Sequence, residues 1–126
     1  MRYRHEMPLG ANLLADGRAR FTLWAPDAAS VDLVLRGETV PMSGNEEGVF
    51  EAKAWAAHGD LYRYRIDGEQ EVPDPASRYQ PEDVHGPSMV VDPERFDWDD
   101  EGWRGRPWEE TVLYELHVGT FSPEGT

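Results

Sequence analysis

The sequence predicts an all-β protein in which short antiparallel strands pack as two facing sheets. Apolar side chains recur with a period of two, which is the period of a strand that buries one face. Each alternating run is short and ends in Gly, Asp, Asn or Pro, the residues that form tight turns. Strands with one apolar and one charged face bury the apolar face against a second sheet, so the pattern predicts a β-sandwich.

Four runs carry this alternation, and in the first of them Phe21 and Leu23 alternate with Thr22 and Trp24. The four predicted strands cover residues 21–25, 31–36, 50–54 and 62–66. The predicted turns lie at residues 16–17, 25–27, 43–45, 58–60 and 67–68. Strands and turns at this spacing predict an immunoglobulin-like sandwich over residues 9–91, preceded by an N-terminal arm of residues 1–8.

The chain changes character after the last of these turns. Residues 72–93 hold five prolines, which exclude a helix or a central strand, so we expect an irregular segment that wraps across the sandwich. Residues 92–110 are acidic and contain three tryptophans, which is typical of a linker. Residues 112–118 form a largely apolar run that predicts a parallel strand buried on both faces.

Composition and charge exclude several classes of function. The net charge of −13 argues against binding to nucleic acid or to an anionic membrane surface. The absence of cysteine excludes disulfides, thiolate zinc sites and cysteine nucleophiles. We find neither an apolar run long enough to span a membrane nor a secretory signal, and we expect a cytoplasmic protein.

No motif in the sequence supports a metal, a cofactor or a catalytic centre. Residues 97–102 begin like a calcium loop, but Trp108 occupies the twelfth position, where a glutamate is required. An exposed acidic linker is the better interpretation, and the four histidines lack the spacing of metal ligands. The residue pattern by itself predicts a non-catalytic β-sandwich without a cofactor.

Five stretches of the sequence resemble a known family. Residues 21–35, which include Trp24-Ala25-Pro26-Asp27-Ala28, resemble the early-set sandwich domain that precedes the barrel in many α-amylase superfamily enzymes, and residues 60–68 resemble its closing hairpin. Residues 73–78 (PDPASR), 84–87 (VHGP) and 114–126 (YELHVGTFSPEGT) are similar to the malto-oligosyltrehalose trehalohydrolase family. The resemblance covers the chain from about Leu9 to Thr126.

This resemblance implies a non-catalytic amino-terminal domain of a glycoside hydrolase that releases trehalose from malto-oligosyl trehalose. Residues 111–126 would then be the first strand and loop of an incomplete (β/α)₈ barrel, with both catalytic carboxylates on later strands. We therefore expect the 126 residues alone to be inactive. A glycogen debranching or branching enzyme and a free-standing immunoglobulin-like interaction module remain alternatives, although the apolar run near the C-terminus argues against the free module.

The aromatic residues are the candidate contact sites. The tryptophans that stack on sugar in starch-binding relatives have no counterpart in residues 36–40 or 69–71, so we expect weak binding of malto-oligosaccharide. Trp55, and after it Trp24, are the remaining candidates for sugar contact, although structural packing is the more common role. The side chains expected at the interface with the barrel are Trp98, Trp103, Trp108, Leu113, Tyr114 and Leu116. Self-association through the same C-terminal strand is a further expectation.

Overall fold

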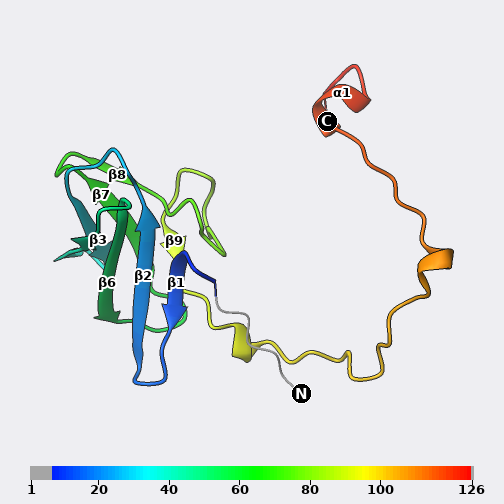
Figure 1. The fold of residues 1–126 in the computed structure, drawn as a ribbon, viewed down its shortest axis with the longest axis horizontal. Helices are drawn as coiled ribbons and strands as arrows, with labels where there is room; N and C mark the ends of the chain where they lie inside the picture. Colours follow the sequence, from blue (N-terminus) through cyan, green and yellow to red (C-terminus); the bar gives the residue numbers. More distant parts are fainter. Residues whose placement is uncertain (1–6, 126) are drawn as a thin grey trace. The chain divides into compact units, whose positions relative to one another are not determined.

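The computed structural model describes residues 7–125, so the proposed arm lies largely outside the described residues. The described chain divides into two compact units between Arg95 and Phe96. Within the described residues the first unit contains nine strands in two antiparallel sheets. Figure 1 shows the course of the chain through them. The prediction of an all-β sandwich is therefore confirmed.

The first sheet has the strand order β1-β2-β6-β5. These strands are β1 (Gly10–Leu13), β2 (Arg18–Trp24), β6 (Val49–Trp55) and β5 (Ser43–Gly44). The second sheet has the order β4-β3-β7-β8, and β9 also pairs with β7. These strands are β4 (Glu38–Pro41), β3 (Val31–Leu35), β7 (Leu61–Ile66), β8 (Gln70–Val72) and β9 (Ser88–Met89).

All four strands predicted from alternation are present, as β2, β3, β6 and β7. Their expected inward residues form the core, which includes Phe21, Leu23, Val31, Leu33, Leu35, Phe50, Ala52, Tyr62 and Tyr64. Phe21 of the first sheet meets Tyr62 of the second edge to face, with ring centroids 5.0 Å apart. Such a pair adds about 0.5–1.5 kcal/mol to the stability that burial alone provides.

The five remaining strands are short, and alternation does not reveal them. The β3–β4 hairpin turns through Arg36 and Gly37, which have φ angles of 52° and 84°. A two-residue hairpin with both central φ angles positive matches the right-handed twist of the strands. The β7–β8 turn begins at Asp67, whose Oδ1 accepts hydrogen bonds from the backbone N–H groups of Ala29 and Ser30. This carboxylate joins two loops at one end of the sandwich.

The proline-rich segment is irregular, as predicted. It leaves the second sheet at the end of β8 and returns to the same edge of β7 as β9. Arg78 donates hydrogen bonds to the backbone oxygen of Ala11 and to Oδ1 of Asn12, which both belong to β1. The segment therefore ties the edge of the second sheet to the edge of the first and closes one side of the sandwich.

The prediction of a strand over residues 112–118 is wrong for the described chain. Residues 111–117 have no regular secondary structure, and a one-turn helix α1 follows at Val118–Phe121. The second unit otherwise contains only the short 3₁₀ helix η2 (Trp108–Glu110), whereas η1 (Pro93–Arg95) belongs to the first. A parallel strand needs hydrogen-bonded neighbours, and no described residue pairs with this run.

No helix within residues 7–125 is both long and apolar enough to cross a lipid bilayer. The regular secondary structure of the described residues is almost entirely the two sheets of the first unit.

The turn before β6 gives a direct test of the fold. Gly48 has a φ of +76°, and a Cβ there would lie 2.4 Å from Cα of Pro26. Gly48→Ala should lower the free energy of unfolding by about 1–2 kcal/mol for the left-handed backbone, and by a further ~1–3 kcal/mol for the steric overlap. Urea unfolding measures the loss.

Gly68 is the matched control for this substitution. It has a φ of +75°, and a Cβ added there would have no other atom within 4 Å, so Gly68→Ala isolates the cost of the backbone conformation. Equal losses of stability in the two variants would show that the contact with Pro26 does not constrain the turn.

Candidate functional site

Trp24 and Trp55 both lie on the outer face of the β2–β6 pair. Trp24 pairs with Val49 and Trp55 pairs with Arg18, so the two tryptophans stand at opposite ends of the ladder. Arg18 and Trp24 are six residues apart in β2, which places the two indoles about 20 Å apart along the strands. The structure therefore puts both candidates on one face but does not bring them together.

Trp24 is 59% exposed and is held by its polar edge. Its indole Nε1–H donates to the backbone oxygen of Glu47 at 3.1 Å, in the turn that precedes β6. The same turn is closed by Asn45, whose Oδ1 accepts from the backbone N–H groups of Glu47 and Val49. Trp24 thus holds a turn in place.

Trp55 is 66% exposed and stands beside a groove of about 290 Å³. The groove is lined by Leu35, Arg36, Glu38, Val40, Lys53, Ala54 and Trp55. Arg36 donates from Nη2 to the backbone oxygen of Trp55 at 3.2 Å and from Nη1 to Oδ2 of Asp60 at 2.9 Å. The guanidinium therefore fixes the end of β6 against the next loop.

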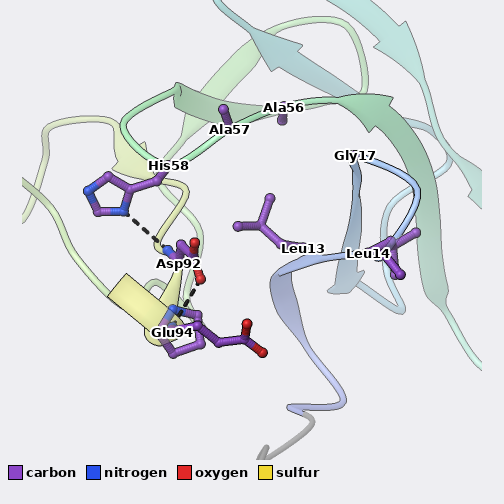
Figure 2. Close-up of a pocket in the computed structure, with 10 residues that line it drawn as sticks. Leu13, Leu14, Gly17, Ala56, Ala57, His58, Asp92 and Glu94 are labelled. Carbon is purple, nitrogen blue, oxygen red and sulfur yellow. Dashed lines mark hydrogen bonds between the residues drawn. The ribbon is translucent and has the colours of Figure 1, made fainter. Parts of the chain in front are cut away.

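A second hollow, of about 480 Å³, lies where the β1–β2 turn, the β6–β7 loop and residues 92–94 meet. Figure 2 shows Leu13 pointing into this space, with His58, Asp92 and Glu94 on the opposite side. The backbone N–H of Asp92 donates to Nδ1 of His58 at 3.1 Å, which requires that nitrogen to be unprotonated. No aromatic ring of the indole or phenol type lines this hollow.

Asp74, in the proline-rich segment, is a buried acidic residue of the first unit. Its Oδ2 accepts hydrogen bonds from the hydroxyl groups of Tyr62 at 2.7 Å and Tyr64 at 3.2 Å. Its Oδ1 accepts from the backbone N–H of Ala76, and its own N–H donates to Oγ of Ser88. Burial raises the pKa of Asp74 above its ordinary value, although the tyrosine hydroxyls oppose the shift. Burial and the nearby carboxylate also raise the pKa of both tyrosines.

This buried network is structural, because the Asp74 residue is only 3% exposed and lines neither hollow. The sequence showed Asp74 only as one residue of a proline-rich stretch. The signal that could have revealed it is the presence of two inward tyrosines on one strand, since buried hydroxyl groups need acceptors.

The predicted interface residues all belong to the second unit and are exposed. The exposed fractions are 67% for Trp98, 66% for Trp103, 72% for Trp108, 80% for Leu113, 75% for Tyr114 and 45% for Leu116. Within that unit Trp98 contacts Phe96 ring to ring, at 4.7 Å between centroids. Within residues 7–125, no three acidic or histidine side chains converge as a metal site, including those of the calcium-like loop.

Two antiparallel sheets and a closing hairpin at Asp67-Gly68 define an immunoglobulin-like β-sandwich domain. Residues 8–93 match the family carbohydrate-binding module 48 (isoamylase N-terminal domain), and the chain belongs to that family.

The curated relatives with high similarity are long enzymes. The chain is 44% identical over 118 residues to the malto-oligosyltrehalose trehalohydrolase of Rhizobium sp. (strain M-11), which covers 87% of this chain and 20% of the relative. It is 45% identical over 122 residues to the enzyme of the same name from Saccharolobus solfataricus, covering 95% of this chain and 21% of the relative. The chain thus spans about a fifth of the length of the curated relatives it matches.

A solved structure shares both the fold and the sequence. The crystal structure of a putative α-amylase from Salmonella typhimurium matches with a TM-score of 0.81 and 43% identity, covering 97% of this chain and 21% of that one.

The buried carboxylate yields a pH test. Because the pKa of Asp74 is raised in the folded state, the folded chain binds more protons than the unfolded chain in the interval above the ordinary carboxyl pKa. The stability that Asp74 contributes is therefore full at acidic pH and declines as the pH rises through the raised pKa. Asn cannot titrate, so the stability advantage of the wild type over Asp74→Asn should shrink as the pH rises from below the ordinary carboxyl pKa through the raised pKa of Asp74.

Urea unfolding of both proteins across this pH range measures the difference, in which the titration of every other carboxyl group cancels. A difference that grows with pH would show that the carboxylate, rather than the carboxylic acid, is the preferred buried form.

Proposed function

We propose that the chain is the amino-terminal, non-catalytic part of an enzyme that releases trehalose from malto-oligosyl trehalose by hydrolysing an α-1,4-glucosidic bond. The proposal rests on how much of the chain aligns with the trehalohydrolases. The family match ends at residue 93, whereas the trehalohydrolase of Saccharolobus solfataricus aligns with 95% of the chain, and so includes most of the second unit. Sandwiches of this kind occur in enzymes that catalyse many different reactions. The sequence after residue 93 therefore distinguishes between these enzymes better than the fold does.

The degree of identity favours this enzyme over the branching-enzyme alternative. Trehalohydrolases from several organisms are 38–46% identical to the chain, while a glucan branching enzyme from Bacillus caldolyticus is 33% identical. Debranching enzymes are represented by a pullulanase from Klebsiella pneumoniae, at 26% identity and a TM-score of 0.60. The free-standing module has no specific observation in its favour.

The role proposed for the second unit is contact with a catalytic barrel. Its three tryptophans and the side chains of Leu113, Tyr114 and Leu116 leave a large apolar area in water. Soluble proteins expose such area mainly where another surface covers it, and aromatic residues dominate such contacts. In the enzyme the covering surface would be the remainder of the barrel.

A cytoplasmic location also stays a prediction.

The first prediction from this proposal concerns catalysis. Residues 1–126 should release no trehalose from maltotriosyl trehalose, because both catalytic carboxylates of such an enzyme lie on later barrel strands. The protein extended to its natural length should release trehalose in the same assay. Turnover by the 126 residues that survives repurification would contradict the assignment of a non-catalytic role.

The second prediction concerns the exposed apolar run. The 126-residue chain should self-associate at high concentration, and Leu113→Glu combined with Leu116→Glu should abolish the association without unfolding the sandwich. Sedimentation velocity measures the association, and circular dichroism controls for the fold. At about millimolar concentration, an association free energy of only ~4 kcal/mol is enough for half of the chains to associate. A wild-type chain that sediments as a monomer at this concentration would therefore contradict the prediction.

A further inference from the structure

Two cations stand directly opposite each other on the outer face of the first sheet, in which β2 lies between β1 and β6 (Figure 1). In the register of β2 and β6, Arg20 pairs with Lys53. Both side chains point away from the core, because the adjacent residues Phe21 and Ala52 are buried on the inner face. Opposed residues have Cβ atoms about 4.5–5.5 Å apart, so two like charges at these positions destabilise the sheet.

Neither cation has an acidic partner within residues 7–125. Four arginines of the described chain form ion pairs with Asp or Glu, namely Arg18, Arg36, Arg65 and Arg106. Arg20 and Lys53 form none, and Glu51, which lies on the same face, contacts neither of them as an ion pair. The chain has 25 acidic residues and only 12 Lys and Arg residues. An uncompensated pair of cations is therefore an exception that a shortage of carboxylates does not explain.

The same face contains two shielded polar atoms that lack a hydrogen bond. They are Nε of Arg20 and Oγ1 of Thr22, the two shielded side-chain nitrogen or oxygen atoms within residues 7–125 that have no partner. Thr22 pairs with Glu51 and is only 5% exposed. Buried polar groups normally find a partner, so an unpaired one indicates that a water molecule, an ion or a ligand completes the site.

Two adjacent cations and a hydroxyl group suit an oxyanion with two negative charges. A phosphate monoester carries about −1.5 to −2 charges at pH 7 and has three strong acceptor oxygens. An arginine guanidinium donates to phosphate through two parallel N–H groups, while a lysine ammonium acts as a point charge. A carboxylate has one charge and two oxygens, so it would leave one of the two cations uncompensated.

We propose that Arg20, Lys53 and Thr22 form a binding site for a phosphate group on the outer face of the first sheet. The anion lies between the two cationic groups and becomes their common partner. When the Arg20 side chain turns toward the anion, its Nε gains an acceptor, and the Thr22 hydroxyl can donate to a remaining oxygen. Arg78 adds positive charge beside the site, because it donates to Asn12, which pairs with Arg20 on the other side.

The net charge of −13 does not prevent such a site from binding an anion. At an ionic strength of about 0.15 M, exposed charges more than about 8 Å away are largely screened, so the adjacent cations dominate the local potential. Neither Arg20 nor Thr22 lines either of the two hollows, and the face is open to water. Exposed ion pairs contribute little free energy, so we expect a dissociation constant of about 1–10 mM.

The experiment titrates inorganic phosphate into the ¹⁵N-labelled 126-residue chain at pH 7 and constant ionic strength, and follows the backbone amide and arginine Nε–H signals by NMR. The signals of Arg20, Thr22 and Lys53 should shift with a dissociation constant of about 1–10 mM. Acetate, which has a single charge, should shift the same signals at least fivefold less at equal concentration. Glucose 6-phosphate tests the source of the group: tighter binding than inorganic phosphate identifies a phosphate monoester as the ligand, and equal binding identifies the free ion.

Variants separate the site from general attraction of anions to arginine. Arg20→Gln and Lys53→Gln should each weaken phosphate binding at least fivefold. Arg63→Gln is the matched control, because Arg63 is a half-buried strand arginine that donates to the backbone oxygen of His85 and has no carboxylate partner, and it should change binding less than 1.5-fold. Glu51→Gln should strengthen binding about two- to threefold by removing a negative charge from the same face.

The stability of the fold gives a second readout. In chloride buffer, Lys53→Gln should raise the melting temperature by about 1–4 °C, because it removes one of two opposed like charges. Phosphate should then stabilise the wild type more than Lys53→Gln, and the comparison cancels the general stabilisation of folded proteins by phosphate. Lys53 is exposed, so this variant keeps the proposal testable if Arg20→Gln unfolds.

Three results would overturn the inference. They are shifts of equal size with acetate and phosphate, equal phosphate affinity of the wild type and Lys53→Gln, and a lower melting temperature of Lys53→Gln in chloride buffer. None of them bears on trehalose release by the natural-length protein, which tests the proposed function separately.

Discussion

The buried carboxylate of Asp74 is the contact on which the irregular half of the first unit depends. Segment 73–87 contains no regular secondary structure, so its position is set by side-chain contacts rather than by a backbone ladder. Asp74 accepts from two tyrosines of β7 and reaches Ser88 through its backbone, which joins the two ends of the segment to the same strand. In a site shielded from water, an acceptor with three donors is stable, whereas any one donor left alone would cost about 1–3 kcal/mol.

The two open sides of the sandwich are consequently closed by different means. On the side of β1, the proline-rich segment covers the gap, and Arg78 bonds it to Ala11 and Asn12. On the side of β4, two residues of β5 are the only strand cover of β6 among the described residues, and a groove remains. The two sides differ because the covering segments differ in length. Residues 73–87, which are 15 residues, cover the side of β1, whereas β5 on the side of β4 has only two residues.

Alternation predicted the central strands because burial on one face imposes a period of two, and Phe21, Leu33 and Tyr64 follow it. Edge strands such as β4 were not predicted, because an edge strand buries little and its residues have no periodic signal. The sequence identified Trp55 as an aromatic at a strand end. It did not indicate the groove, because Arg36 comes from the β3–β4 hairpin of the second sheet, whereas Lys53 and Trp55 lie on β6 of the first. The number of residues between these two segments does not indicate that they lie side by side. The apolar run near the C-terminus has strand-like composition, yet pairing is a property of two segments and not of one.

The shortness of β5 makes the groove adjustable independently of the core. The connection between Pro41 and Val49 carries β5 and the turn at Asn45, and its side chains are mostly exposed. Surface connections tolerate insertions at low cost, since each doubling of loop length costs only about 0.6 kcal/mol. A connection at least four residues longer would be needed to extend β5 alongside Lys53 and Trp55 and fill the groove, and the inward residues of β3, β6 and β7 would keep their places. The length of the connection between β4 and β6 therefore determines whether this sandwich has a ligand-sized recess at that edge, while its hydrophobic interior stays the same.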